Sequence, residues 1–157
     1  MAYPHTNFKV VLVEPEIPNN TGNIGRTCIG MWSELHLVEP LGFDIDDKAV
    51  KRAGLDYWPE LELFRYENLE CWLEQVSNPT RVFYFTTKVD RPFYDISFQQ
   101  GDTFVFGKET KGLPEDLLKK YPEQCVTIPF VGPIRSFNLS NAVSMVLSEG
   151  MRQLAHK

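Results

Sequence analysis

Short β-prone runs alternate with helical segments along the whole chain, and this alternation constrains the fold more than any other feature. The runs are rich in Val, Ile, Phe and Tyr, as strands of a pleated sheet require. Strands are expected at Lys9–Val13, Leu35–Val38, Arg81–Thr87, Asp102–Phe106 and Cys125–Ile128. The alternation predicts an α/β fold: a doubly wound, mainly parallel sheet with helices on both faces.

Helical patterns fill the intervals between these strands. They are expected from Asn20–Thr21 to Met31, over Asp46–Ala53, over Glu67–Gln75 and from Pro114 to Lys120. Pro15 and Pro18 predict an extended loop before the first helix, which Asn20 and Thr21 would cap. Gly54 would end the second helix. The last helix is the clearest, because apolar residues recur at helical spacing at Leu139, Val143, Val146, Leu147, Met151 and Leu154. No repeat or linker interrupts residues 1–157, which we expect to form a single domain.

Composition narrows the classes of function. No apolar run approaches the roughly 20 residues that span a bilayer, and the N-terminus does not resemble a signal peptide, so a cytoplasmic protein without a membrane partner is expected. Three cysteines and three histidines are scattered, which argues against a metal site, a disulfide framework and a Ser-His-Asp triad. The net charge of −5 counts against a nucleic-acid partner, although clustered lysines and arginines allow one basic face.

Three polar loops are the candidate functional segments, because ligands of such sheets bind beyond the carboxyl ends of the strands. They are Asn20–Arg26, Phe106–Leu113 and Ile128–Ala142. Each has a structural alternative. Gly107 and Gly112 suit an ordinary turn as well as a ligand loop. Ser136, Asn138, Ser140 and Asn141 suit helix capping. Arg26 suits a solvent-exposed helix face.

Taken together and in this order, the three loops resemble the motifs of the SPOUT superfamily, in its SpoU (TrmH-like) branch of RNA 2′-O-ribose methyltransferases. Glu14–Ile24, Arg52–Tyr57 and Thr86–Lys88 also resemble the small TrmL (YibK) subgroup, and the similarity covers nearly the whole chain. One position departs from that subgroup, because Ser148 stands where a tyrosine is common.

The resemblance implies a C-terminal trefoil knot, a homodimer whose active site draws on both subunits, and S-adenosylmethionine as cofactor, with S-adenosylhomocysteine as product and no metal. The implied substrate is the ribose 2′-hydroxyl of the wobble pyrimidine, position 34, in the anticodon stem-loop of leucine tRNAs. Arg26 matches the catalytic arginine, and Glu109 and Asn138 match residues that organise the loops. The implied cofactor-binding residues are Phe85, Thr86, Gly107, Gly112, Ile128, Ser136 and Phe137. Our candidates for RNA contact are Lys51, Lys88, Arg91 and Arg135.

Methyl transfer from a sulfonium is an in-line displacement that brings the ribose oxygen to about 3 Å from the methyl carbon. Arg26 would orient a phosphate and stabilise the developing alkoxide, because a guanidinium has a pKa above about 12. The proton could pass to phosphate, water or a transiently neutral arginine. Three other functions stay open: methylation of another tRNA or rRNA site, a catalytically inactive RNA-binding module, and a Rossmann-like protein that binds another nucleotide.

Overall fold

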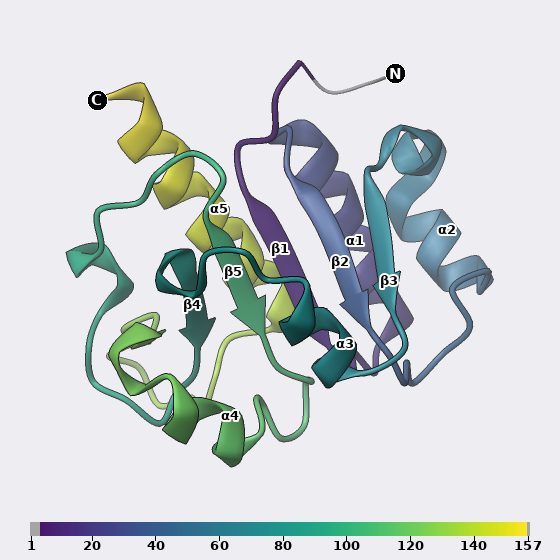
Figure 1. Cartoon of the computed structure of the whole chain (residues 1–157). Coiled ribbons are helices and arrows are strands. Elements are labelled where there is room, and N and C mark those ends of the chain that lie inside the picture. Colours follow the sequence, from purple (N-terminus) through teal and green to yellow (C-terminus); the bar gives the residue numbers. More distant parts are fainter. Residues whose placement is uncertain (1–3, 157) are drawn as a thin grey trace.

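A six-stranded parallel sheet forms the centre of the protein (Figure 1). The computed structural model describes residues 4–156, and for residues 54–56 it describes the backbone alone. The strands are β1 (Lys9–Val13), β2 (Glu34–Val38), β3 (Leu63–Tyr66), β4 (Val82–Phe85), β5 (Thr103–Phe106) and β6 (Cys125–Val126). Their spatial order is β3-β2-β1-β5-β4-β6, and every paired strand is parallel to its neighbour. The expected sheet is confirmed.

Helices cover both faces of this sheet, so the doubly wound architecture is confirmed as well. The α-helices are α1 (Pro18–Gly30), α2 (Lys48–Gly54), α3 (Leu69–Glu74), α4 (Glu115–Lys120) and α5 (Leu139–Ala155). Short 3-10 turns are η1 (Leu55–Glu60), η2 (Pro79–Arg81), η3 (Phe93–Asp95) and η4 (Pro122–Gln124). In Figure 1, α1 and α5 lie behind the sheet and α3 lies in front of it.

Each face of the sheet has its own apolar core. Behind the sheet, Phe8, Phe104 and Leu12 pack with Ile24 of α1 and with the inner side of α5. The predicted stripe of α5 is confirmed there, since its Val143, Val146 and Leu147 are fully buried. Burial of such side chains contributes about 1.5–3 kcal/mol each.

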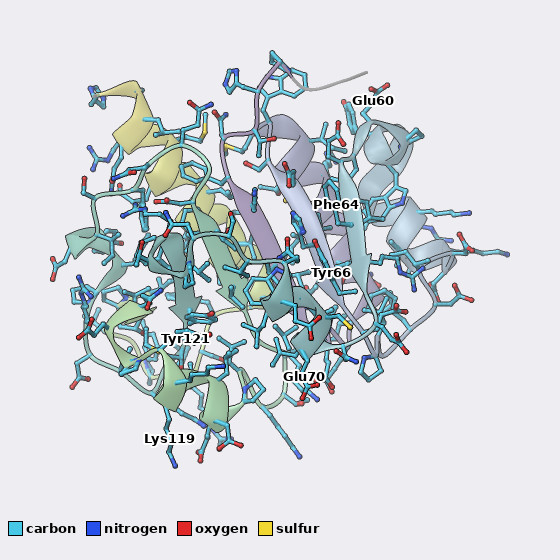
Figure 2. All side chains as sticks on the ribbon, in the orientation of Figure 1. Glu60, Phe64, Tyr66, Glu70, Lys119 and Tyr121 are labelled. Carbon is cyan, nitrogen blue, oxygen red and sulfur yellow. The ribbon has the colours of Figure 1, made fainter. Side chains whose placement is uncertain are left out.

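The front core is smaller and centres on Trp72 of α3 and on Leu117 of α4, which pack against Val11 and Val105. Tyr121 follows α4 and stacks on Tyr84, with the ring centroids 5.3 Å apart (Figure 2). The front of β3 is less covered, because Phe64 remains 41% exposed beside Tyr66 (Figure 2).

Two expectations about individual elements are wrong. β3 was not expected, so residues 4–156 form six strands rather than five. The first helix begins at Pro18, and Asn20 and Thr21 lie inside it, buried, instead of capping it. Pro18 fits the first helical turn because the N–H that proline lacks has no intrahelical partner there. The trefoil knot stays a prediction.

Candidate active site

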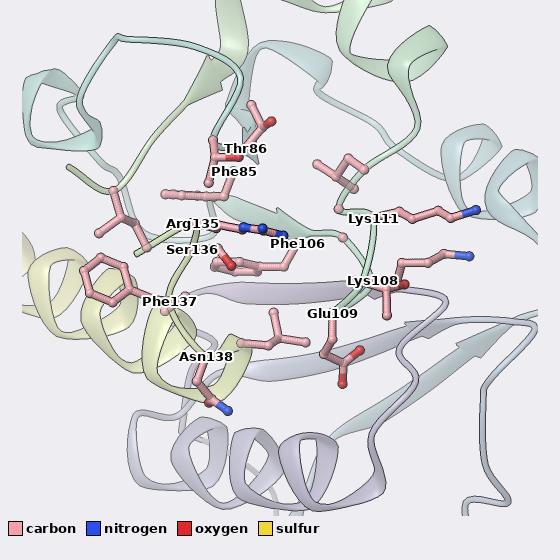
Figure 3. Close-up of a pocket in the computed structure, with 18 of the residues that line it drawn as sticks. Phe85, Thr86, Phe106, Lys108, Glu109, Lys111, Arg135, Ser136, Phe137 and Asn138 are labelled. Atoms are coloured by element: carbon pink, nitrogen blue, oxygen red, sulfur yellow. The ribbon is translucent and has the colours of Figure 1, made fainter. Parts of the chain in front are cut away.

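A cavity of about 440 Å³ opens at the carboxyl edge of the sheet, beyond β4, β5 and β6 (Figure 3). In the register of the sheet, Phe85 lies opposite both Phe106 and Val126, so three strands end at the same level. The loops that follow them therefore share one rim. Phe85 and Phe106 stack at a centroid distance of 4.9 Å, and both line the cavity. The order in which the chain adds strands to the sheet reverses here: β5 lies between β1 and β4, and β6 then lies on the outer side of β4. Open α/β sheets bind ligands at such switch points.

The cavity brings together the residues that the sequence predicted for cofactor binding. All seven line it: Phe85, Thr86, Gly107, Gly112, Ile128, Ser136 and Phe137. Other lining residues were not chosen from the sequence, including Phe106, Lys108, Lys111, Thr127 and Phe130. Lys108 and Lys111 stand within the second loop motif, so their position between the two glycines was the available signal. Phe130 lies in the third loop, and it packs edge-on against Phe137 at 5.7 Å.

Two glycines give the second loop its tight path. A Cβ on Gly107 would lie 2.0 Å from the carbonyl carbon of Gly112 and 2.2 Å from the amide nitrogen of Leu113. Gly112 has a φ of +69°, in the left-handed region that favours glycine. Its N–H donates to the Lys108 carbonyl at 2.9 Å, which closes the loop. The backbone on both sides of the loop therefore approaches more closely than any side chain would allow.

Glu109 connects this loop to the start of α1. Its carboxylate accepts the backbone N–H groups of Glu16 and Ile17, each at 2.8 Å, and the side-chain amide of Asn20 at 3.2 Å. A negative charge beside a helix N-terminus is also favourable to the helix dipole. In return, the Glu16 carboxylate accepts the N–H and hydroxyl of Thr110, which lowers the pKa of Glu16.

Asn138 joins the third loop to the same network. Its side-chain oxygen accepts the N–H groups of Ser140 and Asn141, so it is the N-cap of α5. Its amide nitrogen donates to the side-chain oxygen of Asn20 at 3.2 Å. Figure 3 shows Glu109 and Asn138 extending toward α1 from opposite sides. The three loop motifs are thus linked through Asn20, and the organising positions expected for Glu109 and Asn138 are found.

Four basic side chains line the cavity: Lys88, Lys108, Lys111 and Arg135. Lys88 pairs with Glu115 at 3.0 Å, and Lys108 with Glu14 at 3.4 Å. In Figure 3, Arg135 reaches across the cavity while Lys108 and Lys111 extend away from it. Two of the four RNA-contact candidates, Lys88 and Arg135, are therefore at the rim.

The other two RNA-contact candidates lie elsewhere. Arg91 donates to the carbonyl of Glu123 at 2.7 Å, and Lys51 lies on α2, 3.9 Å from Asp46. Neither is among the described residues that line the cavity.

Arg26 is also outside the described lining of the cavity. It is exposed on α1, where its Cζ lies 5.3 Å from the ring centroid of Tyr57. Asn20, which does line the cavity, precedes it by about 9 Å along the helix and faces roughly 120° away around the axis. The structure therefore keeps the predicted catalytic arginine on the cavity's helix, yet on a different side of it.

Comparison with known proteins places the chain among RNA methylases. A model of the SpoU rRNA Methylase family matches residues 7–148. A tRNA (cytidine(34)-2′-O)-methyltransferase of Escherichia coli (strain K12) is 48% identical over 150 residues, covering 95% of each chain.

Solved structures agree with this placement. One, from a study of 2-OH methylation of C/U34 on tRNA, superposes with a TM-score of 0.91 at 40% identity and covers 98% of this chain and 99% of its own. An AdoMet-bound rRNA methyltransferase from Sinorhizobium meliloti shares the fold at a TM-score of 0.85 and 23% identity, covering 98% of this chain and 59% of its own. With the family model spanning nearly the whole fold, the chain belongs to the SpoU methylase family.

Proposed function

We propose that the protein transfers a methyl group from S-adenosylmethionine to the ribose 2′-hydroxyl of the wobble pyrimidine, nucleotide 34, of tRNA. One observation carries the proposal: the seven residues expected to bind the cofactor come from three separate loops and all line one cavity. Full-length similarity to a tRNA (cytidine(34)-2′-O)-methyltransferase supports the substrate. By the same resemblance, we propose leucine tRNAs as targets, a cytoplasmic setting, and catalysis by residues 1–157 as one knotted domain.

The cavity suits S-adenosylmethionine in size and chemistry. Its volume of about 440 Å³ falls within the range of roughly 300–1,000 Å³ typical of small-molecule sites. Phe85, Phe106 and Ile128 offer apolar walls for the adenine, while Ser136 and the loop backbone offer polar groups for the ribose and the amino-acid arm. When bound, the cofactor supplies an electrophilic methyl group on a sulfonium. No cluster of potential metal ligands was found within residues 4–156.

The residues of the chain would position the ribose and stabilise charge. Gly107 and Gly112 let the backbone approach the ligand closely, which fixes the direction of in-line attack. The ribose hydroxyl would be held in line with the methyl group that the cofactor supplies, and its proton would leave to phosphate or water. The Arg26 guanidinium would hold the neighbouring phosphate and stabilise the developing alkoxide.

RNA would enter over the basic rim. Lys88 and Arg135, joined by Lys108 and Lys111, contribute positive charge around the cavity mouth in a chain of net charge −5. Lysine and arginine attract the phosphate backbone without reading sequence. The nucleotide itself would be splayed out of the single-stranded anticodon loop, as RNA-modifying proteins require. Binding should therefore weaken steeply with salt.

A homodimer would complete the site, because Arg26 lies outside the described lining of its own cavity. Exposed apolar side chains are available for the contact just before α1, on α5 and on the loop between β6 and α5: Ile17, Met145, Val131 and Ile134. A two-fold axis beside α1 would place Arg26 of one protomer near the cavity of its partner.

Mixing two inactive variants tests the shared site. Arg26→Ala removes the arginine and Gly107→Val blocks the cofactor loop, so neither homodimer should turn over. Co-refolding equal amounts yields half mixed dimers, each with one intact site of two. Activity should then return to roughly one quarter of the wild-type level. Activity that stays at the level of the separate variants, with mixed dimers verified by mass, would show that each site belongs to one chain.

The function itself is tested by incubating the protein with labelled S-adenosylmethionine and total tRNA, then mapping the modified nucleotide. We expect one 2′-O-methyl group at position 34. Label at another nucleotide would overturn the substrate assignment and keep the reaction. No label in any RNA would favour a binding module without catalysis.

A further inference from the structure

The hairpin of α2 and η1 is docked on α1 through two glycines (α2 lies beside α1 in Figure 1). A Cβ on Gly22 would lie 2.5 Å from the Val50 carbonyl oxygen and 2.6 Å from Cβ of Ala53. A Cβ on Gly25 would lie 2.3 Å from the Trp58 ring. The missing side chains at these two positions allow α2 and η1 to approach the α1 backbone.

This docking brings two residues that adjoin the contact, one on each element, side by side. Arg26 follows Gly25 on α1, and Tyr57 precedes Trp58 on η1. The Arg26 Cζ lies 5.3 Å from the Tyr57 ring centroid, within the roughly 6 Å range of a cation–π contact. Trp58 is partly buried against the core behind the sheet, whereas Tyr57 is 48% exposed. Trp58 anchors the turn, and Tyr57 is free to act on the arginine.

We propose that Tyr57 is a positioning residue for Arg26 in the methyl transfer, an inference that rests on the proposed function. A free arginine side chain samples many rotamers, and ordering it costs conformational entropy. The Tyr57 ring restricts those rotamers before RNA binds.

An aromatic partner also differs from an acidic one in its effect on charge. A carboxylate would offset the positive charge and occupy N–H donors, whereas a ring face attracts the cation without occupying those donors. The Arg26 donors therefore stay available for phosphate and for the developing alkoxide. Tyr57 acts through Arg26 and need not touch the cofactor or the reacting oxygen.

The test replaces the ring while leaving the docking intact. Tyr57→Leu should lower kcat roughly two- to fivefold, because this is the change in rate that corresponds to the loss of an exposed cation–π contact. The KM for S-adenosylmethionine should not change. Tyr57→Phe should keep kcat near the wild-type value. Phe64→Leu is the matched control, since Phe64 is similarly exposed at the far edge of the sheet (Figure 2).

Electronic substitution separates positioning from packing. Phenylalanine, 4-fluoro- and 3,5-difluorophenylalanine at position 57 have nearly the same shape and a progressively weaker ring quadrupole. Turnover should fall along that series at constant thermal stability, and the KM for S-adenosylmethionine should stay the same across it.

Equal turnover across the series, or an unchanged kcat for Tyr57→Leu, would overturn the role of Tyr57 and leave the methyltransferase assignment intact. A wild-type protein that methylates no RNA would instead remove the proposed function. An Arg26→Ala variant with full activity would remove the role of Arg26 on which the positioning by Tyr57 depends.

Discussion

Single residues set the geometry of the cavity, and Gly107 is the position where the smallest change has the largest expected effect. Its Cβ would collide with backbone atoms of Gly112 and Leu113, which cannot move aside as a flexible side chain can. Even Gly107→Ala should displace the loop, at a cost of about 1–3 kcal/mol. Affinity for S-adenosylmethionine, measured by calorimetry, should fall roughly tenfold or more.

Gly30→Ala is the matched control for that substitution. A Cβ there meets nothing within 4 Å, and Gly30 is the last residue of α1, so affinity should not change. Equal affinity of the two variants would contradict the role assigned to Gly107.

Also at the residue scale, Glu109 lines the cavity, and its carboxylate joins the second loop to the start of α1. Glu109→Gln replaces a carboxylate that accepts from Glu16, Ile17 and Asn20 with an amide that has one accepting oxygen. We expect a loss of about 1 kcal/mol in the free energy of unfolding and weaker cofactor binding. Glu67→Gln, an exposed carboxylate outside any helix or strand, should change neither quantity in denaturant unfolding or calorimetry. Unaltered cofactor affinity in Glu109→Gln would show that the three loops are ordered independently.

Among the elements, α5 depends on one close contact with the start of the chain. A Cβ on Gly150 would lie 2.7 Å from the Phe8 ring, which is itself fully buried. Alanine favours a helix over glycine by about 1 kcal/mol, but overpacking costs about 1–3 kcal/mol. Gly150→Ala should therefore lower Tm, whereas Ser148→Ala on the exposed side of the same helix should not. A raised Tm for Gly150→Ala would mean that Phe8 has room to move.

The elements also show where sequence patterns are sufficient. The strands before the cavity were predictable because each is a buried β-branched or aromatic run, as in Val82–Phe85. β3 was not, because it is a four-residue edge strand whose Phe64 and Arg65 are exposed, so it has no buried alternation. α1 was misplaced at its start because Asn, Thr and Gly are weak helix formers. Contacts of Gly22 and Gly25 with α2 and η1 stabilise it, and these contacts are distant in sequence.

For the site, the sequence motifs predicted which residues line the cavity, but they did not predict the position of Arg26. Phe85, Gly107 and Ile128 follow from strand ends in a parallel sheet, whose carboxyl ends share one edge. The helix register of Arg26 depends on where α1 begins, and that start was misread. Lys108 and Lys111 were missed because a lysine in a loop is ordinarily solvent-exposed, and only the folded loop brings them to the cavity.

At the scale of the whole molecule, one polar network fastens the outer strands of the sheet and predicts a pH dependence. The Glu34 carboxylate accepts from Thr6 at 2.8 Å and lies 2.8 Å from Nε2 of His36, whose Nδ1 lies 2.8 Å from the Tyr66 hydroxyl. The hydrogen bond with His36 is the largest influence that lowers the pKa of Glu34 below its usual 4.5, with Thr6 and Lys9 adding to it.

A lowered pKa means that Glu34 contributes stability above pH 4.5 and that this contribution disappears as the pH falls through the lower folded-state pKa. Glu34→Gln should therefore reduce Tm at neutral pH, and the Tm values of the two proteins should converge as the pH falls below the folded-state pKa of Glu34. A Tm difference that is constant from neutral to acid pH would show that the charge of Glu34 does not stabilise the fold.

We propose that the cavity holds the cofactor and that Arg26 stabilises the developing charge during methyl transfer. The most direct test measures S-adenosylmethionine affinity and tRNA methylation for the wild-type protein and Arg26→Ala in the same buffer. The prediction is an unchanged affinity, since Arg26 lies outside the described lining of the cavity, together with loss of turnover. Full methylation by Arg26→Ala would contradict the account.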